Sequence, residues 1–600
     1  MSRRTPPGES SGNRPRPGRL RVIAGRPSPL GIERISEPRV RQIRWAARAW
    51  SGLIVLTFWT LLFRLGAPFV EDVGSWQRQV QIGLLVTATI GAAIAWRIEI
   101  AGATVMILSG AGLGVLATFS YSPTVAFLPF AAFLVPSVLH WIAWQRTQPA
   151  LAIAILALFV TGVAVAGAYA ADNVYQTYFG PTHPASASLQ PPANTVYWAW
   201  AGGTTSRSTV IKARLASSYE EVRLAVSDND EMEDPVSIAP AALSPQNVAT
   251  FEIDGLEPDR RYYYALEIDR TIDETRRGQV QTFPDGAASF SFAFGACART
   301  GSNGAVFDTI RDADPLFYLS GGDLHYGDIN ENDPDLFRAA YQTVLTTPAQ
   351  ALLYRSTSTS YIWDDHDYGA NDSDRTSPSR DAAFTAYDES VPHYELAAND
   401  APAIYQAFTV GRVRFILTDL RSARDPASQP DTPEKSMMGE KQKAWFKQEL
   451  LDADGNYPVI VWLSTVPWIA GEAVGADHWG GYSSERREIA EFIAENDIDG
   501  LLMLGGDAHM VAIDDGSNND YAKGDAAHFP VFHAAALDRY GTTKGGPYSE
   551  GEYPGGGQFG IVSVEDDGGD EIAITLSGRN WRGDEIVSYR YTIPVVSDET

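Results

Sequence analysis

Five apolar segments follow one another near the start of the 600-residue chain, and this pattern constrains the fold more than any other feature. They cover residues 49–66, 80–96, 101–119, 123–144 and 150–171. Each is close to the ~20 residues that an α-helix needs to cross the hydrocarbon core of a bilayer. A buried helical core would also be apolar, but five successive runs with short gaps favour a membrane domain over residues 49–172.

The distribution of arginine predicts how this membrane domain is oriented. Residues 1–48 hold 12 arginines against 3 acids and are rich in Pro, Gly and Ser, which predicts a disordered basic arm. Such an arm stays in the cytoplasm, and an odd number of spans then places residues 173–600 outside. Residues 1–172 carry a net charge of +9 and the remainder −36, so the two parts face different surroundings. We therefore expect an integral protein of a bacterial plasma membrane.

The extracytoplasmic part divides into a linker and two domains. Residues 173–193 are rich in Pro and Ser and predict a linker. Residues 194–287 contain short alternating strands with frequent turns, which predicts a β-sandwich. Within them, "GLEPDRRYYYALEI" resembles the end of a fibronectin type III module. Residues 288–600 alternate apolar strands with helical stretches and predict an α/β domain.

Residues with metal-binding side chains follow the strands of this α/β domain. Ligands of open α/β sheets bind beyond the carboxyl ends of the strands, so these side chains are expected to converge. The candidate metal ligands are Cys297, Asp323, Tyr326, Asp365, Asp507 and His509. Thiolate and phenolate donors favour a transition metal such as iron, whereas carboxylates alone also suit Mg²⁺, Ca²⁺ or Mn²⁺. A mixed site with two or more metal ions is the simplest interpretation.

A series of motifs supports this interpretation. Residues 290–565 resemble the PhoD-like (alkaline phosphatase D) branch of the calcineurin-like metallophosphoesterases, through "FGAC", "GGDLHYGD", "WDDHDYGAND", "DLRSAR", "GGDAHM" and "AALDRYGTTKGGPYSEG". The resemblance implies a four-layer α/β/β/α catalytic domain at 288–600, preceded by the family's N-terminal fibronectin-III-like module. It also implies that Asp323 bridges two metals, that Tyr326 and Cys297 bind the iron-like ion, and that Asp365 supplies a metal ligand. His366 falls where the superfamily has the histidine that contacts the phosphate and the leaving group.

The resemblance further implies a phosphomonoesterase or phosphodiesterase whose metal centre activates a hydroxide for in-line attack on phosphorus. Iron plus calcium is the expected metal pair, with Mn or Zn as substitutes. Asn371 and Arg421 are candidate substrate contacts, and Arg424 and Lys544 are further cations that suit phosphate. Two alternatives stay open, namely a phospholipase-D-type diesterase acting on lipid headgroups and a non-catalytic membrane sensor. No nucleic-acid-binding module is expected, and the sequence leaves the oligomeric state undetermined.

Overall fold

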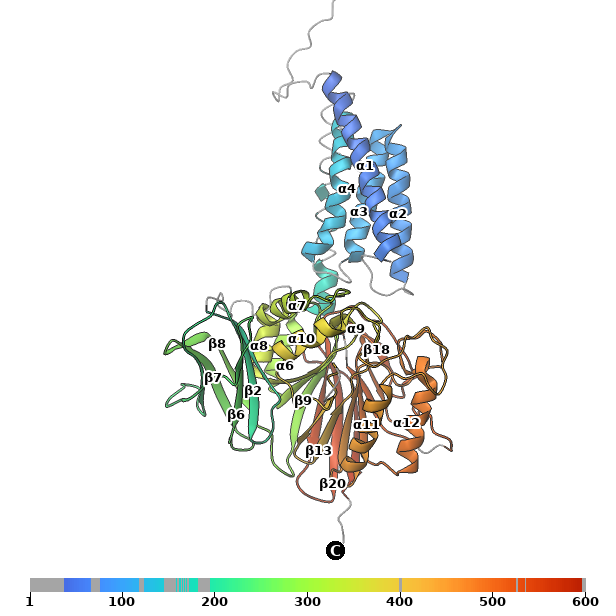
Figure 1. Ribbon diagram of the computed structural model, residues 1–600. Coiled ribbons are helices and arrows are strands. Elements are labelled where there is room, and N and C mark those ends of the chain that lie inside the picture. The colour runs from blue at the N-terminus through green and yellow to red at the C-terminus, as the bar shows by residue number, and fades with distance from the viewer. Residues whose placement is uncertain are drawn as a thin grey trace, which may run out of the picture.

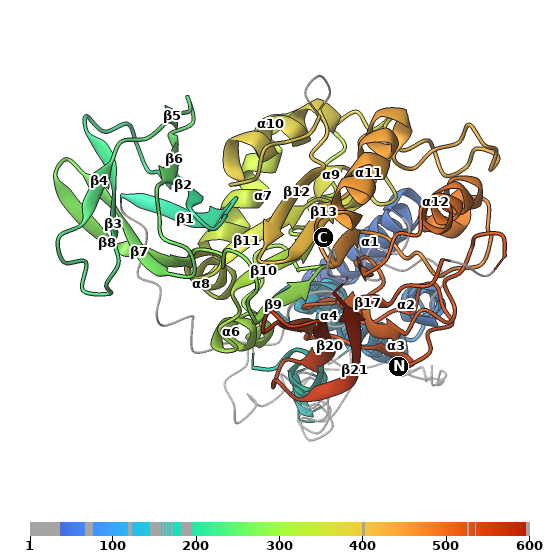
Figure 2. The same ribbon diagram turned by 90° about the horizontal axis from the view of Figure 1, so that it is seen from below.

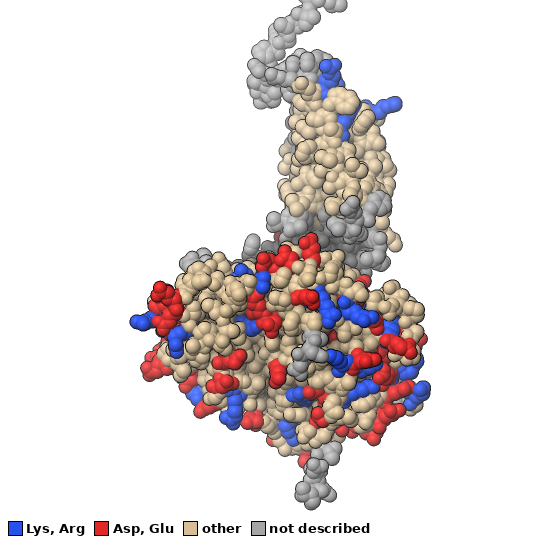
Figure 3. Space-filling model, viewed as in Figure 1, with Lys and Arg blue, Asp and Glu red and all other residues tan. Residues whose placement is uncertain are grey.

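The computed structural model describes residues 37–65, 76–117, 123–144, 172–181, 195–398, 402–524, 527–534 and 536–595, with single residues between 158 and 169. The described parts form a helical bundle, a short connecting helix, a β-sandwich and an α/β domain (Figure 1). The bundle projects from one end of the α/β domain, and the sandwich packs against its side. Figure 3 shows the same division in charge, because the bundle is largely uncharged along its length whereas the lower part carries many acids and bases.

The bundle includes four helices whose bounds lie within the described residues, namely α1 (Glu37–Leu65), α2 (Trp76–Ala95), α3 (Glu99–Ala117) and α4 (Pro123–Trp144). Three described helical segments are long and apolar enough to cross a membrane, Val40–Leu62, Glu99–Ala117 and Phe127–Trp144. The apolar part of α2, Gln79–Ala95, is shorter. The predicted fifth segment, 150–171, lies almost entirely outside the described residues, so the expectation of five spans is not confirmed. Exposed apolar side chains on the bundle, including Leu56 and Leu128, are compatible with a lipid environment.

The connection between the bundle and the α/β domain differs from the expected Pro/Ser linker. Residues 172–179 form a helix, which we call the stalk helix, and it packs against the α/β domain. Its side chains Tyr175 and Phe179 are only 6% and 2% exposed. The predicted linker at 173–193 therefore begins with a docked helix, because its early aromatic residues supply an apolar face that Pro and Ser further along the segment lack.

Two four-stranded antiparallel sheets form the β-sandwich within the predicted 194–287 region. One contains β1 (Val196–Gly202), β2 (Ser208–Leu215), β6 (Val248–Asp254) and β5 (Ala242–Leu243); the other contains β4 (Val236–Ile238), β3 (Val222–Ser227), β7 (Arg261–Ile268) and β8 (Thr271–Gln281). The sandwich is joined to the α/β domain by hydrogen bonds such as Trp200 Nε1 to the Ser390 carbonyl at 2.9 Å. The resemblance of this sandwich to fibronectin type III stays a prediction.

Two larger sheets lie face to face in the α/β domain. The six-stranded sheet has the order β11 (Ser358–Ile362), β10 (Phe317–Gly321), β9 (Phe290–Gly295), β19 (Gln558–Glu565), β20 (Glu571–Asn580), β21 (Glu585–Pro594). The seven-stranded sheet has the order β12 (Gln406–Val410), β13 (Val413–Leu417), β14 (Val459–Ser464), β15 (Leu501–Gly505), β17 (Val531–Ala534), β16 (Met510–Asp514), β18 (Glu552–Pro554). Aromatic side chains fill the space between them; for example, the rings of Phe292 and Phe415 are 5.3 Å apart.

Helices cover both outer faces of this pair of sheets (Figures 1 and 2). One side carries α6 (Ala305–Asp312), α7 (Pro334–Thr346), α8 (Pro348–Ser356) and α10 (Arg380–Ser390). The other carries α11 (Gly439–Asp454) and α12 (Ser483–Glu495), whose residues Phe446 and Ile489 join a second core with Trp462 of β14. The predicted four-layer α/β/β/α arrangement is thus observed. Central strands such as β14 are buried along their whole length, as expected for parallel strands covered on both faces.

The parallel strands bring the candidate ligands to one edge. Strands β9, β10 and β11 are parallel neighbours, and so are β13, β14, β15 and β17. The carboxyl ends of both sets lie at the same end of the domain, where the sheets approach each other closely. A Cβ atom at Gly506 would be 2.4 Å from the carbonyl oxygen of Gly321, so only glycine fits at this contact.

Candidate active site

Three overlapping groups of potential metal ligands lie at this edge. They are Cys297 with Asp323 and His509; Asp323 with Asp365 and His366; and Asp365 with Asp372 and Asp477. Within each group the ligand atoms lie within 4.8 Å of one another. Asp323 belongs to two groups and Asp365 to two groups, so these carboxylates are placed to connect neighbouring positions. This sharing is what a centre with more than one metal ion requires.

The backbone at these positions is held in an unusual conformation. Cys297, Asp323, Asp507 and His509 have φ angles of +62°, +54°, +60° and +35°. Such left-handed values are uncommon for residues other than glycine, cost of order 1–3 kcal/mol each and cluster at functional sites. The turns direct these side chains back across the strand ends toward one another.

The first group contains the predicted iron ligands. The Sγ atom of Cys297 lies 3.5 Å from Oδ2 of Asp323, and the Tyr326 hydroxyl lies 3.0 Å from Nε2 of His509. The other ring nitrogen of His509 donates to the carbonyl of Tyr540 at 3.1 Å, which fixes the ring orientation. Burial, reinforced by Lys544, lowers the pKa of His509 to about 3, so its imidazole is neutral and suited to bind a cation. Burial raises the pKa of the Cys297 thiol.

The "WDDHD" stretch divides into residues that hold the loop and residues that face the site. Asp367 accepts hydrogen bonds from the backbone N–H groups of Leu324 and Asp364, at 2.8 and 2.6 Å. Asp364 in turn accepts from Arg421 at 2.5 Å and from Thr465 at 2.8 Å. These two acids therefore fix α9 (Asp365–Tyr368), the short helix that follows β11.

Asp365 and His366, at the start of α9, face the site. Asp365 accepts from the backbone N–H of Asp372 at 2.6 Å. Nδ1 of His366 lies 2.6 Å from Oδ1 of Asp328, and its ring centre lies 4.1 Å from that of Tyr326, with the two planes tilted by 36°. Burial opposes a charge on His366, but the carboxylates of Asp365 and Asp323 outweigh it and raise the pKa of His366 well above its usual range. In the metal-free protein, these carboxylates favour the protonated imidazole of His366.

Asp372 and Asp477 are additional candidate ligands that the sequence analysis did not single out. Burial raises the pKa of Asp372 to about 6, while Arg421 and Arg424 outweigh burial and lower the pKa of Asp477. The "DYGAND" segment that follows α9 could have drawn attention to Asp372. Asp477 lies in a loop whose sequence has no recognisable pattern, so only the fold brings it to the site.

The predicted phosphate-binding cations have structural partners. Arg421 is fully buried and pairs with Asp364 and with both carboxylate oxygens of Asp477, at 2.5, 2.9 and 2.9 Å. Arg424 pairs with Asp477 at 2.6 Å, and Lys544 donates to Asp507 at 2.7 Å. We therefore assign Arg421 to holding the acids in place rather than to a direct substrate contact. Asn371 is exposed in the loop after α9.

The donor set fits bound cations. Oδ1 of Asp323 and Oδ2 of Asp507 are buried and have no hydrogen-bond partner among the described residues. Unpaired buried carboxylate oxygens are costly, and a cation would satisfy them. Burial raises the pKa of Asp323 to about 7, since its charge is poorly compensated by the protein alone. Carboxylate, thiol, phenol and imidazole donors together suit a mixed centre with a transition metal.

Arg539 adds one buried positive charge beside this donor set. Its guanidinium carbon lies 3.8 Å from the centre of the Tyr326 ring, and burial lowers the pKa of Arg539 to about 9. The guanidinium makes a cation–π contact with this ring, while burial and the Asp323 carboxylate raise the pKa of the Tyr326 hydroxyl well above its usual range.

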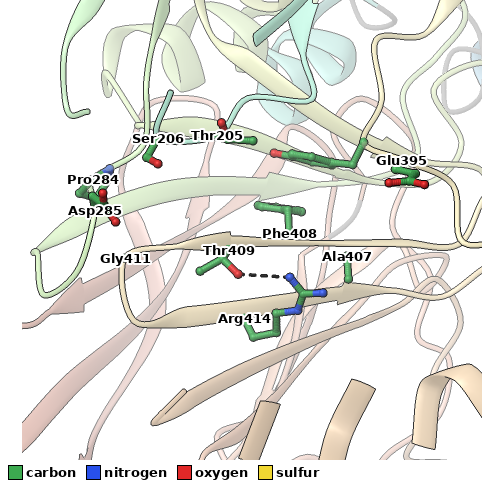
Figure 4. A pocket seen from close by; sticks show the side chains of 11 residues that line it. Thr205, Ser206, Pro284, Asp285, Glu395, Ala407, Phe408, Thr409, Gly411 and Arg414 are labelled. Atoms are coloured by element: carbon green, nitrogen blue, oxygen red, sulfur yellow. Dashed lines mark hydrogen bonds between the residues drawn. The ribbon is translucent and has the colours of Figure 1, made fainter. Parts of the chain in front are cut away.

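A separate hollow of about 460 Å³ lies between the sandwich and the free edge of β12 (Figure 4). Its lining includes Phe408, Thr409 and Arg414 but none of the candidate site residues. Arg414 donates to Thr409 at 3.2 Å and pairs with Glu449 at 2.7 Å. Because Arg414 is already paired with Glu449, this hollow is poorly suited to bind an anion such as phosphate. The candidate active site is therefore the group of residues at the strand ends.

Comparisons with known proteins match two parts of the chain. Residues 292–549 match the model of the family described as PhoD-like phosphatase, and residues 36–152 match that of a domain of unknown function, DUF7670. Alkaline phosphatase D of Bacillus subtilis (strain 168) is 24% identical over 363 residues, covering 51% of this chain and 59% of that protein. The chain thus matches about three fifths of that relative's length.

One solved structure shares the fold, and a second matches more weakly. A structure of PhoD matches with a TM-score of 0.53 and 17% identity over 68% of this chain and 94% of that one. A purple acid phosphatase from yellow lupin (Lupinus luteus) seeds matches with a TM-score of 0.46 and 12% identity over 66% of this chain and 74% of that one.

Proposed function

Because residues 292–549 belong to the PhoD-like phosphatase family, we propose that the protein is a metal-dependent phosphoric ester hydrolase acting on phosphate mono- or diesters. The observation that carries this proposal is the convergence of Cys297, Asp323 and His509 with Asp365 and His366 at one edge of the two sheets. Acidic residues that only keep a protein soluble lie on its surface. Here, carboxylate oxygens of Asp323 and Asp507 are buried and have no hydrogen-bond partner among the described residues.

The ligand side chains hold the cations and position the reacting groups. Cys297, Asp323, Tyr326 and His509 hold an iron-like ion, and Asp323, Asp365 and Asp507 contribute to a second cation, for which calcium, manganese or zinc are candidates. When bound, such ions supply a nucleophilic hydroxide and offset the charge of the phosphate.

His366 and its neighbours handle the proton. With Nδ1 hydrogen-bonded to Asp328, His366 keeps Nε2 available to donate a proton to the leaving oxygen of the ester. In the metal-free protein, Asp365, Asp323 and Asp328 together raise the pKa of His366 well above its usual range. Of these acids, Asp328 is not a proposed metal ligand, so its carboxylate continues to favour the protonated ring when the cations are bound. The tilted contact with the Tyr326 ring and the hydrogen bond to Asp328 together limit the rotation of the imidazole, which favours a single direction of proton delivery.

A metal-exchange assay tests the proposal. The full-length protein in detergent is stripped with a chelator, reloaded with iron plus calcium, manganese or zinc, and assayed on p-nitrophenyl phosphate and bis(p-nitrophenyl) phosphate. We expect metal-dependent hydrolysis that Asp323→Asn abolishes and that Asp312→Asn, a change at an exposed acid on α6, leaves unaltered. Metal-independent hydrolysis, or none with any of these metals, contradicts the proposal.

We also infer that the bundle anchors the enzyme in a membrane, with the N-terminus in the cytoplasm and the α/β domain outside. Three described apolar helices of spanning length and 12 arginines before residue 49 support this inference.

A further inference from the structure

The candidate active site lies at the end of the α/β domain that faces the helical bundle. Helix α9, which carries Asp365 and His366, is close to the lower end of the bundle, and the strands extend away from it (Figure 1). Viewed from the opposite end, the bundle lies behind the α/β domain (Figure 2). A bilayer around the bundle, perpendicular to its helices, would therefore have its surface on the side of the domain where the candidate ligands lie.

The stalk helix is docked on the α/β domain through buried aromatic contacts. The guanidinium of Arg299 lies 5.8 Å from the ring centre of Tyr175 and 5.4 Å from that of Phe179. Trp581 Nε1 donates to the carbonyl of Thr177 at 3.3 Å. A Cβ atom at Gly556 would lie 2.1 Å from the Phe179 ring, so the backbone there must be glycine for the helix to dock. Tyr175 and Phe179 are thus buried as residues of a domain core are, whereas a flexible linker would leave them exposed.

The docked helix also ends beside the metal ligands. The ring of Tyr178 packs edge-on against Tyr540 at 5.3 Å, and the Tyr540 carbonyl is the partner of His509. The described residues between 158 and 169 are also helical. The stalk helix lies between the bundle and the α/β domain, so the chain arrives from the bundle at the edge of the domain that carries the candidate ligands (Figure 1).

Exposed apolar side chains occur on two elements at the same end. Helix α7 and strand β18 lie toward the bundle in Figure 1, and they carry Leu336 and Tyr553, which are 41% and 37% exposed. Isolated exposed apolar residues are common, but here they belong to elements that would face a lipid surface.

We propose that the site is held facing the bilayer so that its substrate is a phosphate ester in a lipid headgroup. This inference rests on the proposed hydrolase function and names its substrate class. In the reaction, the hydroxide oxygen bonds to phosphorus, the bond from phosphorus to an ester oxygen breaks, and that oxygen takes the proton from His366. A soluble phosphate ester can be hydrolysed by the same reaction, but its hydrolysis does not depend on how the site is oriented relative to the bilayer.

An insertion that frees the domain from the bundle without altering the site tests the proposal. About 20 Gly and Ser residues placed between residues 171 and 172 leave the stalk helix docked but let the domain move over roughly 25 Å. The matched control has the same insert after residue 185, beyond the docked helix. Full-length proteins are reconstituted in vesicles of phosphatidylcholine and phosphatidylglycerol, and headgroup release is measured beside hydrolysis of bis(p-nitrophenyl) phosphate.

We expect the unmodified protein and the control to hydrolyse both substrates. The insertion at 171/172 should retain the soluble activity and reduce lipid hydrolysis by about tenfold or more, through the lower effective concentration of headgroups at the site. Soluble hydrolysis by the unmodified protein without headgroup release, or a lipid rate that the insertion leaves unchanged, overturns the proposal. If the metal-loaded protein hydrolyses neither substrate, the proposed function fails and this inference fails with it.

Discussion

Oδ1 of Asp328 lies 2.6 Å from Nδ1 of His366, which places a carboxylate directly behind the proposed proton donor. Asp328 itself is half exposed, so it orients the imidazole from the rim of the site. The pair resembles other arrangements in which a carboxylate fixes the tautomer and the ring direction of a histidine. The effect of this pair on proton transfer can be measured separately from the effect of metal binding.

Asp328→Asn should reduce kcat and shift the alkaline limb of the pH–rate profile to lower pH. The carboxylate contributes to the raised pKa of His366, so its loss lets the imidazole lose its proton earlier. Asp335→Asn, a change at an exposed acid in the first turn of α7, is the control. A lower kcat with an unshifted alkaline limb would contradict this role.

His366→Ala and Cys297→Ser should separate the proton donor from a metal ligand. We expect His366→Ala to retain its metals and lose turnover by about 10²–10⁴-fold, as for a general acid. Cys297→Ser should weaken iron binding and alter the visible charge-transfer band, while the buried hydroxyl costs only about 1–3 kcal/mol of stability. Metal analysis and absorption spectra check both variants. A colourless, iron-free wild-type protein whose activity survives both changes would refute the assignment.

The stability of the metal-free protein should depend on pH through Asp323. Its pKa is raised by burial from 3.8 to about 7 in the folded state, so folding favours its protonated form. The resulting stabilisation is fully present below about pH 4 and is lost as the pH rises through about 7. We therefore expect the Tm of the metal-free wild type, relative to Asp323→Asn, to fall between these values. A pH-independent difference in Tm contradicts this explanation.

Removal of the stalk helix should destabilise the extracytoplasmic part. A fragment of residues 172–600 keeps Tyr175 and Phe179 in their buried sites, whereas a fragment of residues 190–600 leaves the surface around Arg299 and Trp581 exposed. Burying two aromatic side chains contributes about 3–6 kcal/mol, so denaturant unfolding should distinguish the fragments. Equal unfolding free energies would mean that the stalk contact is not stabilising. Phe179→Ala in the longer fragment should reproduce part of the difference.

A reporter enzyme fused after residue 600 should be active only outside the cytoplasm. The expectation follows from the basic N-terminal arm and an odd number of spans. A fusion after residue 48 should show the opposite location and serves as the control. Cytoplasmic activity of the C-terminal fusion would contradict the proposed orientation. It is the result expected if the N-terminal arm stays in the cytoplasm and the chain crosses the membrane four times rather than five.

The sequence by itself determined the apolar helices, the strand-rich middle and which residues are candidate ligands. These features depend on local periodicity and on residue type at strand ends, which can be read without distances. It identified Cys297, Asp323, Asp365 and His509 because each follows an apolar strand, and parallel strands end at a common edge.

Only the tertiary structure decided which charged residues serve which purpose. Arg421 was predicted to contact substrate, but the fold buries it against Asp364 and Asp477, and Asp477 enters the site from a loop that lies more than 50 residues away along the chain. The docking of the stalk helix could likewise not be predicted from the sequence, because the surface that Tyr175 and Phe179 contact is formed by Arg299 and Gly556, which are distant in the chain. Such pairings depend on long-range packing, which local sequence patterns do not encode.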